Sequence, residues 1–144
     1  MADGTANEVV RWQRGDGLTA VPADVVEHLA RCWEDGWNRE DVDLIVAPFA
    51  PGIVFSSPFV SRLSDDGATE LRGLSAVRDY VAASFHRATP GIRYTHDDSY
   101  AGVGGVVLLY TVHHPDGTAR RGADLMDVDG EGRVVAWRCH YPFG

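Results

Sequence analysis

The sequence predicts an α+β domain in which helices pack on one face of a mostly antiparallel sheet. In the first part of the chain, apolar residues recur at the three- and four-residue spacing of amphipathic helices. From residue 92 to residue 141, the pattern changes to strand-like segments separated by glycine-rich turns. Because the helices come first and a meander of strands comes last, neighbouring strands are expected to run antiparallel. The 144 residues suit one domain.

Three helices are expected before the meander. The first begins at Pro22, because proline is well suited to the first turn of a helix. Its inward stripe consists of Val25, Val26, Leu29, Cys32, Trp33 and Trp37. A short second helix over residues 38–50 ends where prolines interrupt the pattern, and a third helix spans residues 74–88. Between them, residues 53–59 are typical of a strand and residues 61–69 of a loop.

The meander should contain four strands, and the dipeptide Asp116-Gly117 predicts the hairpin between the second and third of them. The expected strands are residues 92–100, 106–114, 118–128 and 133–141. If Asp116 and Gly117 are the two central residues of a two-residue turn, His113 pairs with Arg120 and successive pairs follow from there. One face of this hairpin then carries Leu109, Thr111, His113, Gly122, Asp124 and Met126.

On the last strand, alternation separates an inner set of side chains from an outer set. The more apolar set is expected to face inward and consists of Val135, Trp137, Cys139 and Tyr141. The outward set of the last two strands would be Ala123, Leu125, Val134, Ala136, Arg138 and His140. Because four of these six are apolar, where a water-facing sheet should be polar, we expect a homodimer formed through this face. The alternative is a monomer in which the N-terminal arm folds back and covers this face with Val9, Val10 and Trp12.

Composition excludes several classes of function. The formal net charge is −8 and no basic stripe offsets it, so nucleic acid is not expected as a partner. The chain has no lysine, which excludes a Schiff-base nucleophile, a pyridoxal phosphate anchor and a phosphate-loop lysine, and no cofactor is expected. Cys32 and Cys139 are expected to be buried thiols. No apolar run is long enough for a membrane span or a signal peptide, so a cytoplasmic location is expected.

The predicted order of elements and three sequence segments together resemble one known family. The segments are WEDGWNREDVDLIVAPFAPGIVFSSPF (residues 33–59), LRGLSAVRDYV (71–81) and RGADLMDVDGEGRVVAWRCHY (121–141). They are similar to SnoaL-like domains of the nuclear transport factor 2-like superfamily, which includes ketosteroid isomerases, polyketide cyclases, scytalone dehydratase and limonene epoxide hydrolases. The resemblance implies a cone-shaped fold over residues 22–144, in which three helices pack on a highly curved sheet that encloses a pocket. Residues 1–21 would be a flexible arm.

The resemblance also implies roles for individual residues. Asp124 corresponds in position to the ketosteroid isomerase aspartate that stays protonated and donates a hydrogen bond to the enolate oxygen. Burial among apolar side chains would raise its pKa and make it a general acid; the alternative is an aspartate paired with Arg120 or Arg121 at the rim of the sheet. Ser57 stands where ketosteroid isomerases carry their aspartate base, so a standard ketosteroid isomerase is not expected. Trp33 lies near the position of their oxyanion-hole tyrosine.

His113 is the candidate replacement for the missing base, because histidine titrates near neutral pH. Two alternatives are that His113 is a solvated rim residue, or that a bulge turns His114 inward instead. His96 and Asp98 share a strand face, but no third ligand has suitable spacing, so no metal site is expected. The residues expected to contact substrate are Trp33, Phe55, Ser57, Tyr80, Thr111, Met126, Trp137, Cys139 and Tyr141. The alternative for the aromatic members of this set is that they only fill the core.

These expectations combine into one functional hypothesis and one alternative. The hypothesis is a cofactor-independent acid/base enzyme acting on a small, apolar, oxygenated and possibly polycyclic molecule in bacterial secondary metabolism or catabolism. The reaction would be a cyclisation, isomerisation, dehydration or epoxide opening, with Asp124 and His113 as catalytic residues. The alternative is a non-catalytic small-molecule-binding or assembly module that has the same pocket.

Overall fold

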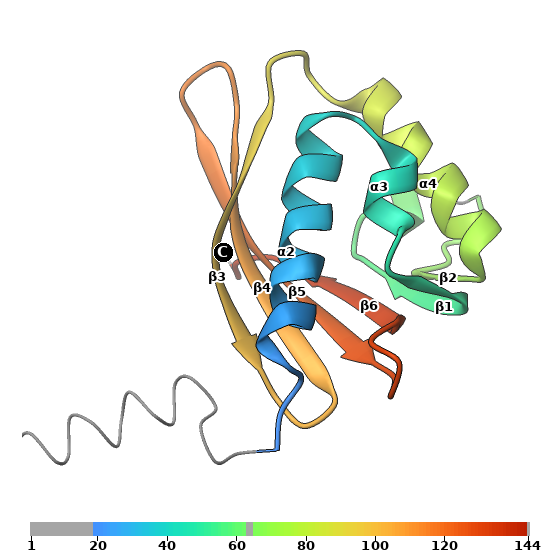
Figure 1. Ribbon diagram of the computed structural model, residues 1–144. Coiled ribbons are helices and arrows are strands. Elements are labelled where there is room, and N and C mark those ends of the chain that lie inside the picture. The colour runs from blue at the N-terminus through green and yellow to red at the C-terminus, as the bar shows by residue number, and fades with distance from the viewer. Residues whose placement is uncertain (1–18, 63–64, 144) are drawn as a thin grey trace, which may run out of the picture.

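Within residues 19–62 and 65–143, which the computed structural model describes, three α-helices lie inside the curve of a six-stranded sheet (Figure 1). The elements in chain order are α2 (Ala23–Asn38), α3 (Val42–Val46), β1 (Phe49–Ser56), the 3-10 helix η1 (Val60–Arg62), β2 (Glu70–Arg72), α4 (Leu74–Arg87), β3 (Arg93–Ala101), β4 (Gly105–His113), β5 (Ala119–Val128) and β6 (Val134–His140). The strand order is β2-β1-β6-β5-β4-β3, and only the β1–β6 pair is parallel. The sheet is curled but not closed, and the expected α+β class with three helices is confirmed.

Helix α2 follows Pro22 and lies along the concave side of the sheet, where it contacts β3 (Figure 1). Its buried face includes Trp33 and Gly36. Gly36 lets α3 approach closely, since a Cβ there would collide with the Ile45 side chain. At the end of the helix, the Asn38 side chain donates to the Tyr94 carbonyl at 2.7 Å and accepts from the Tyr94 N–H at 2.8 Å. These two bonds fix the last turn of α2 against β3.

The expected second helix over residues 38–50 is wrong in extent, because α3 covers only Val42–Val46. Glu40 adopts a positive φ of 52° and breaks the helical path, after which the Asp41 side chain caps α3 by accepting from the Leu44 N–H at 3.1 Å. Beyond Pro48 the chain is already extended, so β1 begins at Phe49, four residues before the expected strand.

The 3-10 helix η1 overlaps the start of residues 61–69, the segment expected to be a loop, and the edge strand β2 follows that segment. Strand β2 pairs antiparallel with β1 through Val54↔Arg72 and Phe55↔Leu71. It was not expected because it has only three residues, two of them charged, which is too short for an alternating pattern to be visible.

The predicted register of the β4–β5 hairpin is wrong by one residue. His113 pairs with Ala119 and not with Arg120, and Tyr110 pairs with Gly122. The turn has three loop residues: the Gly117 N–H donates to the His114 carbonyl at 3.0 Å, and the positive φ of Gly117, 91°, makes room for one extra residue. This shift by one residue exchanges the two faces of β4 relative to the prediction.

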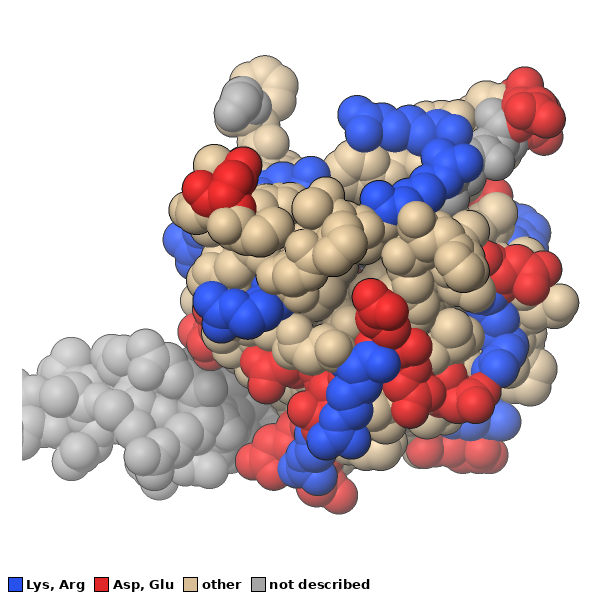
Figure 2. All heavy atoms as spheres, turned by 90° about the horizontal axis from the view of Figure 1, so that it is seen from above, with Lys and Arg blue, Asp and Glu red and all other residues tan. Residues whose placement is uncertain are grey.

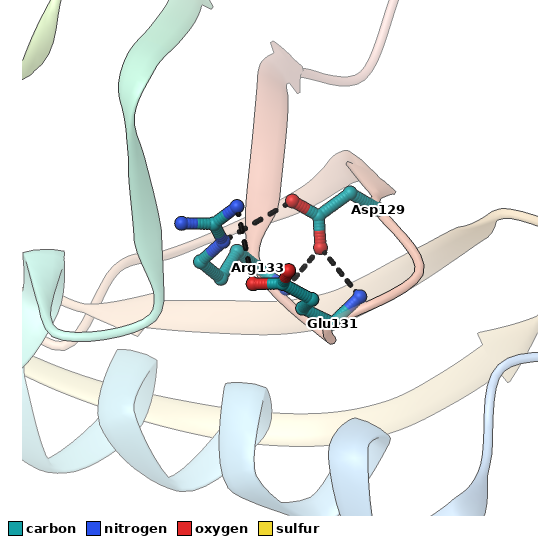
Figure 3. Close-up of polar contacts among 3 residues, drawn as sticks. All are labelled: Asp129, Glu131 and Arg133. Carbon is teal, nitrogen blue, oxygen red and sulfur yellow. Dashed lines mark hydrogen bonds and ion pairs between the residues drawn. The ribbon is translucent and has the colours of Figure 1, made fainter.

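Strands β5 and β6 are joined by a turn that Asp129 organises (Figure 3). Its carboxylate accepts from the backbone N–H groups of Glu131 and Arg133 at 2.9 and 3.0 Å and from the Arg133 side chain at 3.2 Å. These hydrogen bonds lower the pKa of Asp129. The turn lies at the end of β5 remote from the β4–β5 hairpin (Figure 1).

One bulge on β6 corrects the predicted faces of that strand. Val128 pairs with Val134 while Asp127 pairs with Ala136, so Val135 is the extra residue. Val134 is therefore fully buried and Val135 is 38% exposed, the reverse of the expectation for these two positions. From Ala136 onward the expected alternation holds, with Trp137 and Cys139 buried.

Most of the arm expected at residues 1–21 lies outside the described residues. The described part reaches the core, because Val21 is buried and its N–H donates to the Gly102 carbonyl at 2.9 Å. In the described part of the chain, no helix combines the length and hydropathy needed to cross a lipid bilayer.

Candidate functional site

A cavity of about 390 Å³ lies between the helices and the concave side of the sheet. Its walls include the aromatic side chains of Trp33, Phe55, Tyr80, Trp137 and Tyr141, which come from α2, β1, α4, β6 and the C-terminal segment. Ser57, Asp124 and Cys139 also line it. All eight residues belong to the set expected from the sequence. An apolar, largely aromatic wall with a few polar groups is typical of a small-molecule site.

Asp124 is the polar centre of the cavity. Its side chain is 1% exposed and accepts three hydrogen bonds from uncharged donors. The indole N–H groups of Trp33 and Trp137 donate to Oδ2 at 3.2 and 2.8 Å, and the Tyr110 hydroxyl donates to Oδ1 at 3.0 Å. No arginine of the described chain forms an ion pair with Asp124, so the alternative of a rim aspartate paired with Arg120 or Arg121 does not hold.

Burial raises the pKa of Asp124 to about 6, although the hydrogen bonds from Trp137, Tyr110 and Trp33 act in the opposite direction. Desolvation penalises the ionised carboxylate, and none of the ion pairs in the described part of the chain places a cation beside it. The carboxyl therefore changes protonation state in the range where an acid catalyst at near-neutral pH is useful.

The Tyr110 hydroxyl extends the polar centre toward Tyr141 and Ser57. Burial raises the pKa of Tyr110 far above the usual range for a phenol, and the nearby Asp124 charge adds to the effect. Burial likewise raises the pKa of Tyr141, while hydrogen bonding to Tyr110 and Ser57 opposes the shift. Both phenols therefore keep their protons at neutral pH and act as hydrogen-bond donors or acceptors.

Three residues expected at the site do not line the cavity. Because of the register shift, His113 and Thr111 point to the convex face of the sheet, where the His113 ring nitrogen lies 3.1 Å from the Thr95 hydroxyl and Thr111 donates to Asp97 at 2.6 Å. His113 therefore does not share a face with Asp124. Met126 does share that face, but it is buried in the core beyond the cavity.

The cavity also contains residues that the sequence prediction missed. They are chiefly Trp37, Tyr94, Tyr110, His114 and Arg120. Tyr110 and His114 follow directly from the observed register, and the inward position of His114 is the alternative that a bulge was expected to produce. The signal that could have found them is the Pro115-Asp116-Gly117 tripeptide, since a glycine in the third position favours a three-residue loop.

Comparison with solved structures finds the same fold in bacterial proteins. A SnoaL-like protein of unknown function from Burkholderia thailandensis E264 superposes with a TM-score of 0.74 and 25% identity, over 86% of this chain and 99% of that one. A protein of unknown function with a cystatin-like fold from Methylobium petroleophilum PM1 gives a TM-score of 0.66 at 19% identity, over 87% and 80% of the two chains. An NTF2-like protein of unknown function from Mesorhizobium loti gives 0.60 at 22% identity, over 85% and 98%.

Sequence comparison agrees with the fold. No curated protein matches the chain. The model of the SnoaL-like domain family matches residues 29–137, a span that runs from the buried face of α2 to Trp137 and so includes Asp124 and its three hydrogen-bond donors. The chain therefore belongs to the SnoaL-like domain family.

Proposed function

We propose that the protein is a cofactor-independent acid/base enzyme in which Asp124 supplies the acid. The substrate is a small, apolar, oxygenated molecule, and the reaction is an isomerisation, cyclisation, dehydration or epoxide opening. One observation carries the proposal: a fully buried carboxyl group in an aromatic cavity is surrounded by uncharged donors only, and its pKa is raised to about 6. Such a group gives up or takes a proton at little cost near neutral pH.

The donor geometry determines which oxygen of Asp124 carries the proton. An indole N–H can only donate, and both indoles donate to Oδ2, so the proton sits on Oδ1. Oδ1 faces the Tyr110 hydroxyl, which can either donate or accept. When Asp124 is ionised, Tyr110 donates to it; when Asp124 is protonated, Oδ1 donates to Tyr110. The Tyr110 proton is then free for another acceptor in the cavity.

This reversal supplies the chemistry of the proposed reaction. A substrate oxygen that gains negative charge beside Tyr110 accepts a hydrogen bond from the Tyr110 hydroxyl. Protonated Asp124 donates to the same hydroxyl oxygen and so strengthens that bond. In this scheme Tyr110 touches the substrate and Asp124 acts through it or beside it. Ser57 and Tyr80 orient the substrate or a water molecule, since both line the same cavity.

We assign the base to His114 in place of His113. His114 is the only imidazole lining the cavity among the described residues. It lies at the hairpin end, so it would take a proton from the part of the substrate nearest the mouth. With Ser57 in the position of the isomerase aspartate, the cavity has no second carboxylate in the described chain that could do so.

Asp124→Asn tests the proposal. We expect the native protein to turn over at least one of a β,γ-unsaturated ketone, a β-hydroxy ketone and an arene-substituted epoxide, and the variant to lose about 100-fold or more in kcat. Binding of the probe 2-naphthol, followed by calorimetry, should change only a few-fold, because the amide preserves the hydrogen-bond geometry.

Asp127→Asn is the matched control, since Asp127 lies on the same strand but on the convex face, in an ion pair with Arg138. It should retain activity. Unchanged kcat in Asp124→Asn would contradict the acid role.

The second candidate, a non-catalytic binding module, is favoured by the neutral Ser57 and by the three donors that already occupy Asp124. It requires 2-naphthol to bind while none of the three substrates reacts.

We also propose that two copies pair through the convex face of the sheet. Leu109, Ala123 and Leu125 are only partly buried there, and Tyr100 on the edge strand β3 is 58% exposed. Covering apolar surface on a two-fold axis is the commonest way to stabilise such a face. Light scattering should give about twice the 15.7 kDa of one chain, and Leu125→Arg should give one chain. A native mass of one chain, or a dimeric Leu125→Arg, would contradict the pairing.

A further inference from the structure

The mouth of the cavity is basic, although the whole chain carries a formal charge of −8. Three arginines line it, namely Arg62 from η1, Arg87 from the end of α4 and Arg120 from β5. None of the three forms an ion pair with a carboxylate of the described chain. Asp124, the only carboxylate lining the cavity within residues 19–62 and 65–143, is buried at its inner end. The mouth of the cavity is therefore positively charged, and the acidic group lies at its inner end.

Aromatic rings hold two of these guanidinium groups in place. Arg120 lies over the rings of Phe59 and Tyr141, 5.0 and 5.1 Å from their centroids, and Arg62 lies 5.0 Å from the centroid of Phe59. Stacking on a ring leaves the edge of a guanidinium, with its N–H groups, free to donate. Seen from above Figure 1, basic and acidic side chains both surround an area of uncharged side chains (Figure 2).

Strand β5 sets the distance between the basic mouth and the buried acid. Arg120 and Asp124 lie four residues apart on one face of the strand, which is about 13 Å along an extended chain. Gly122 lies between them and carries no side chain, and the ring of Tyr110 occupies the space above it. The Tyr110 hydroxyl lies over Gly122, two residues or about 7 Å along the strand from Arg120, so a ligand that contacts both needs an apolar body that spans this distance along the aromatic walls.

The wall near the mouth holds a further donor without an acceptor. The indole nitrogen of Trp37 is buried and has no hydrogen-bond partner in the described structure. Trp37 lines the same cavity, packed between Phe85 and Tyr94 at the end of α2. A buried donor without an acceptor is unfavourable, so this position favours a ligand rich in acceptor oxygens.

We propose that the cavity binds an elongated apolar carboxylic acid, with its carboxylate bound by Arg120 at the mouth, where Arg62 stacks on the same Phe59 ring, and an oxygen at its other end near Tyr110. The carboxylate matches the planar fork of a guanidinium, which donates two parallel hydrogen bonds to it. This inference rests on the proposed function only for the oxygen near Tyr110. The anionic end follows from the arginines alone, and it names a substrate class that the acid/base chemistry leaves open.

A matched pair of probes tests the anionic end. We use 6-hydroxy-2-naphthoate and its neutral amide, 6-hydroxy-2-naphthamide, and measure both dissociation constants by calorimetry at neutral pH. The acid should bind about tenfold more tightly than the amide, since charge-assisted hydrogen bonds are about twice as strong as neutral ones. Raising the salt concentration should weaken the binding of the acid and leave the binding of the amide unchanged, because the arginines are exposed and salt screens their charge.

Arg120→Gln should bring the ratio of the two dissociation constants close to one, because it should weaken the binding of the acid and leave the binding of the amide unchanged. Arg121→Gln is the matched control: it removes the same charge from the next residue of β5, whose side chain points to the convex face. It should leave the ratio unchanged. Arg62→Gln on η1 provides a second variant if Arg120→Gln does not fold, and it should lower the ratio as well.

Equal binding of acid and amide by the native protein would overturn the inference, and so would an equal loss in Arg120→Gln and Arg121→Gln, which would indicate net charge alone. Failure of both probes to bind would overturn it too, because the cavity would not accept the proposed apolar body. These outcomes are separate from the proposed function, since the effect of Asp124→Asn on turnover does not depend on the charge of the far end.

Discussion

The free energy of unfolding of the native protein is expected to fall between about pH 4 and about pH 7, and Asp124→Asn is expected to remove this fall. The folded pKa of Asp124 is raised from 3.8 to about 6 by burial. A group with a raised folded pKa stabilises the fold fully when it is protonated in both states, and this contribution is lost as the pH rises through the folded pKa. The difference in pKa corresponds to about 3 kcal/mol in the free energy of unfolding.

Asparagine fits the site in the manner of the protonated acid. Its carbonyl oxygen accepts from Trp33 and Trp137, and its amide donates to the Tyr110 oxygen. The variant should therefore gain about 3 kcal/mol relative to the native protein between pH 4 and pH 7, as measured by urea denaturation at each pH. Asp127→Asn, on the convex face, should follow the native curve. Parallel curves for Asp124→Asn and the native protein would show that Asp124 titrates alike in both states.

Gly122→Ala should destabilise the protein by about 2 kcal/mol and disrupt the site at the same time. A Cβ at this position would collide with the ring and hydroxyl of Tyr110, which is itself buried and cannot move freely. Tyr110 would have to leave Asp124, so binding of 2-naphthol should weaken together with stability. Thermal denaturation and calorimetry measure the two effects.

Gly130→Ala is the control for this prediction, because a Cβ there meets nothing within 4 Å and its φ is not positive. It should leave both stability and binding unchanged. If Gly122→Ala were as stable as the native protein and still bound 2-naphthol, the close packing of Tyr110 on Gly122 would not hold the site in place.

The fold could be predicted from the sequence because its signals are local. The stripe of α2 and the alternation of β3 to β6 each lie within one segment, and the helix-first order determines the class. The edge strand β2 was missed because three residues, Glu70–Arg72, do not form a pattern. The second helix was predicted too long because a single backbone break at Glu40 and a cap at Asp41 leave little trace in hydropathy.

Site residues were predicted correctly where the sequence assigned their strand to the correct face, and wrongly where it did not. Asp124, Trp137, Cys139 and Tyr141 were placed by the parity of β5 and β6, and the structure brings all four to the cavity. His113 and Thr111 were assigned through the turn, where one extra residue reverses a face. The three donors to Asp124 come from α2, β4 and β6, and their convergence depends on the curvature of the sheet, which no local pattern encodes.

The parallel pairing of β1 with β6 has a consequence for the order of folding. Strands β3 to β6 are joined by short turns, so their pairing closes small loops. Pairing of Phe55 with Trp137 instead closes a loop that contains most of the domain, and the entropy cost of closure grows with loop length. During synthesis, β1 therefore cannot pair until β6 has been made, and the cavity between them is completed only after that pairing.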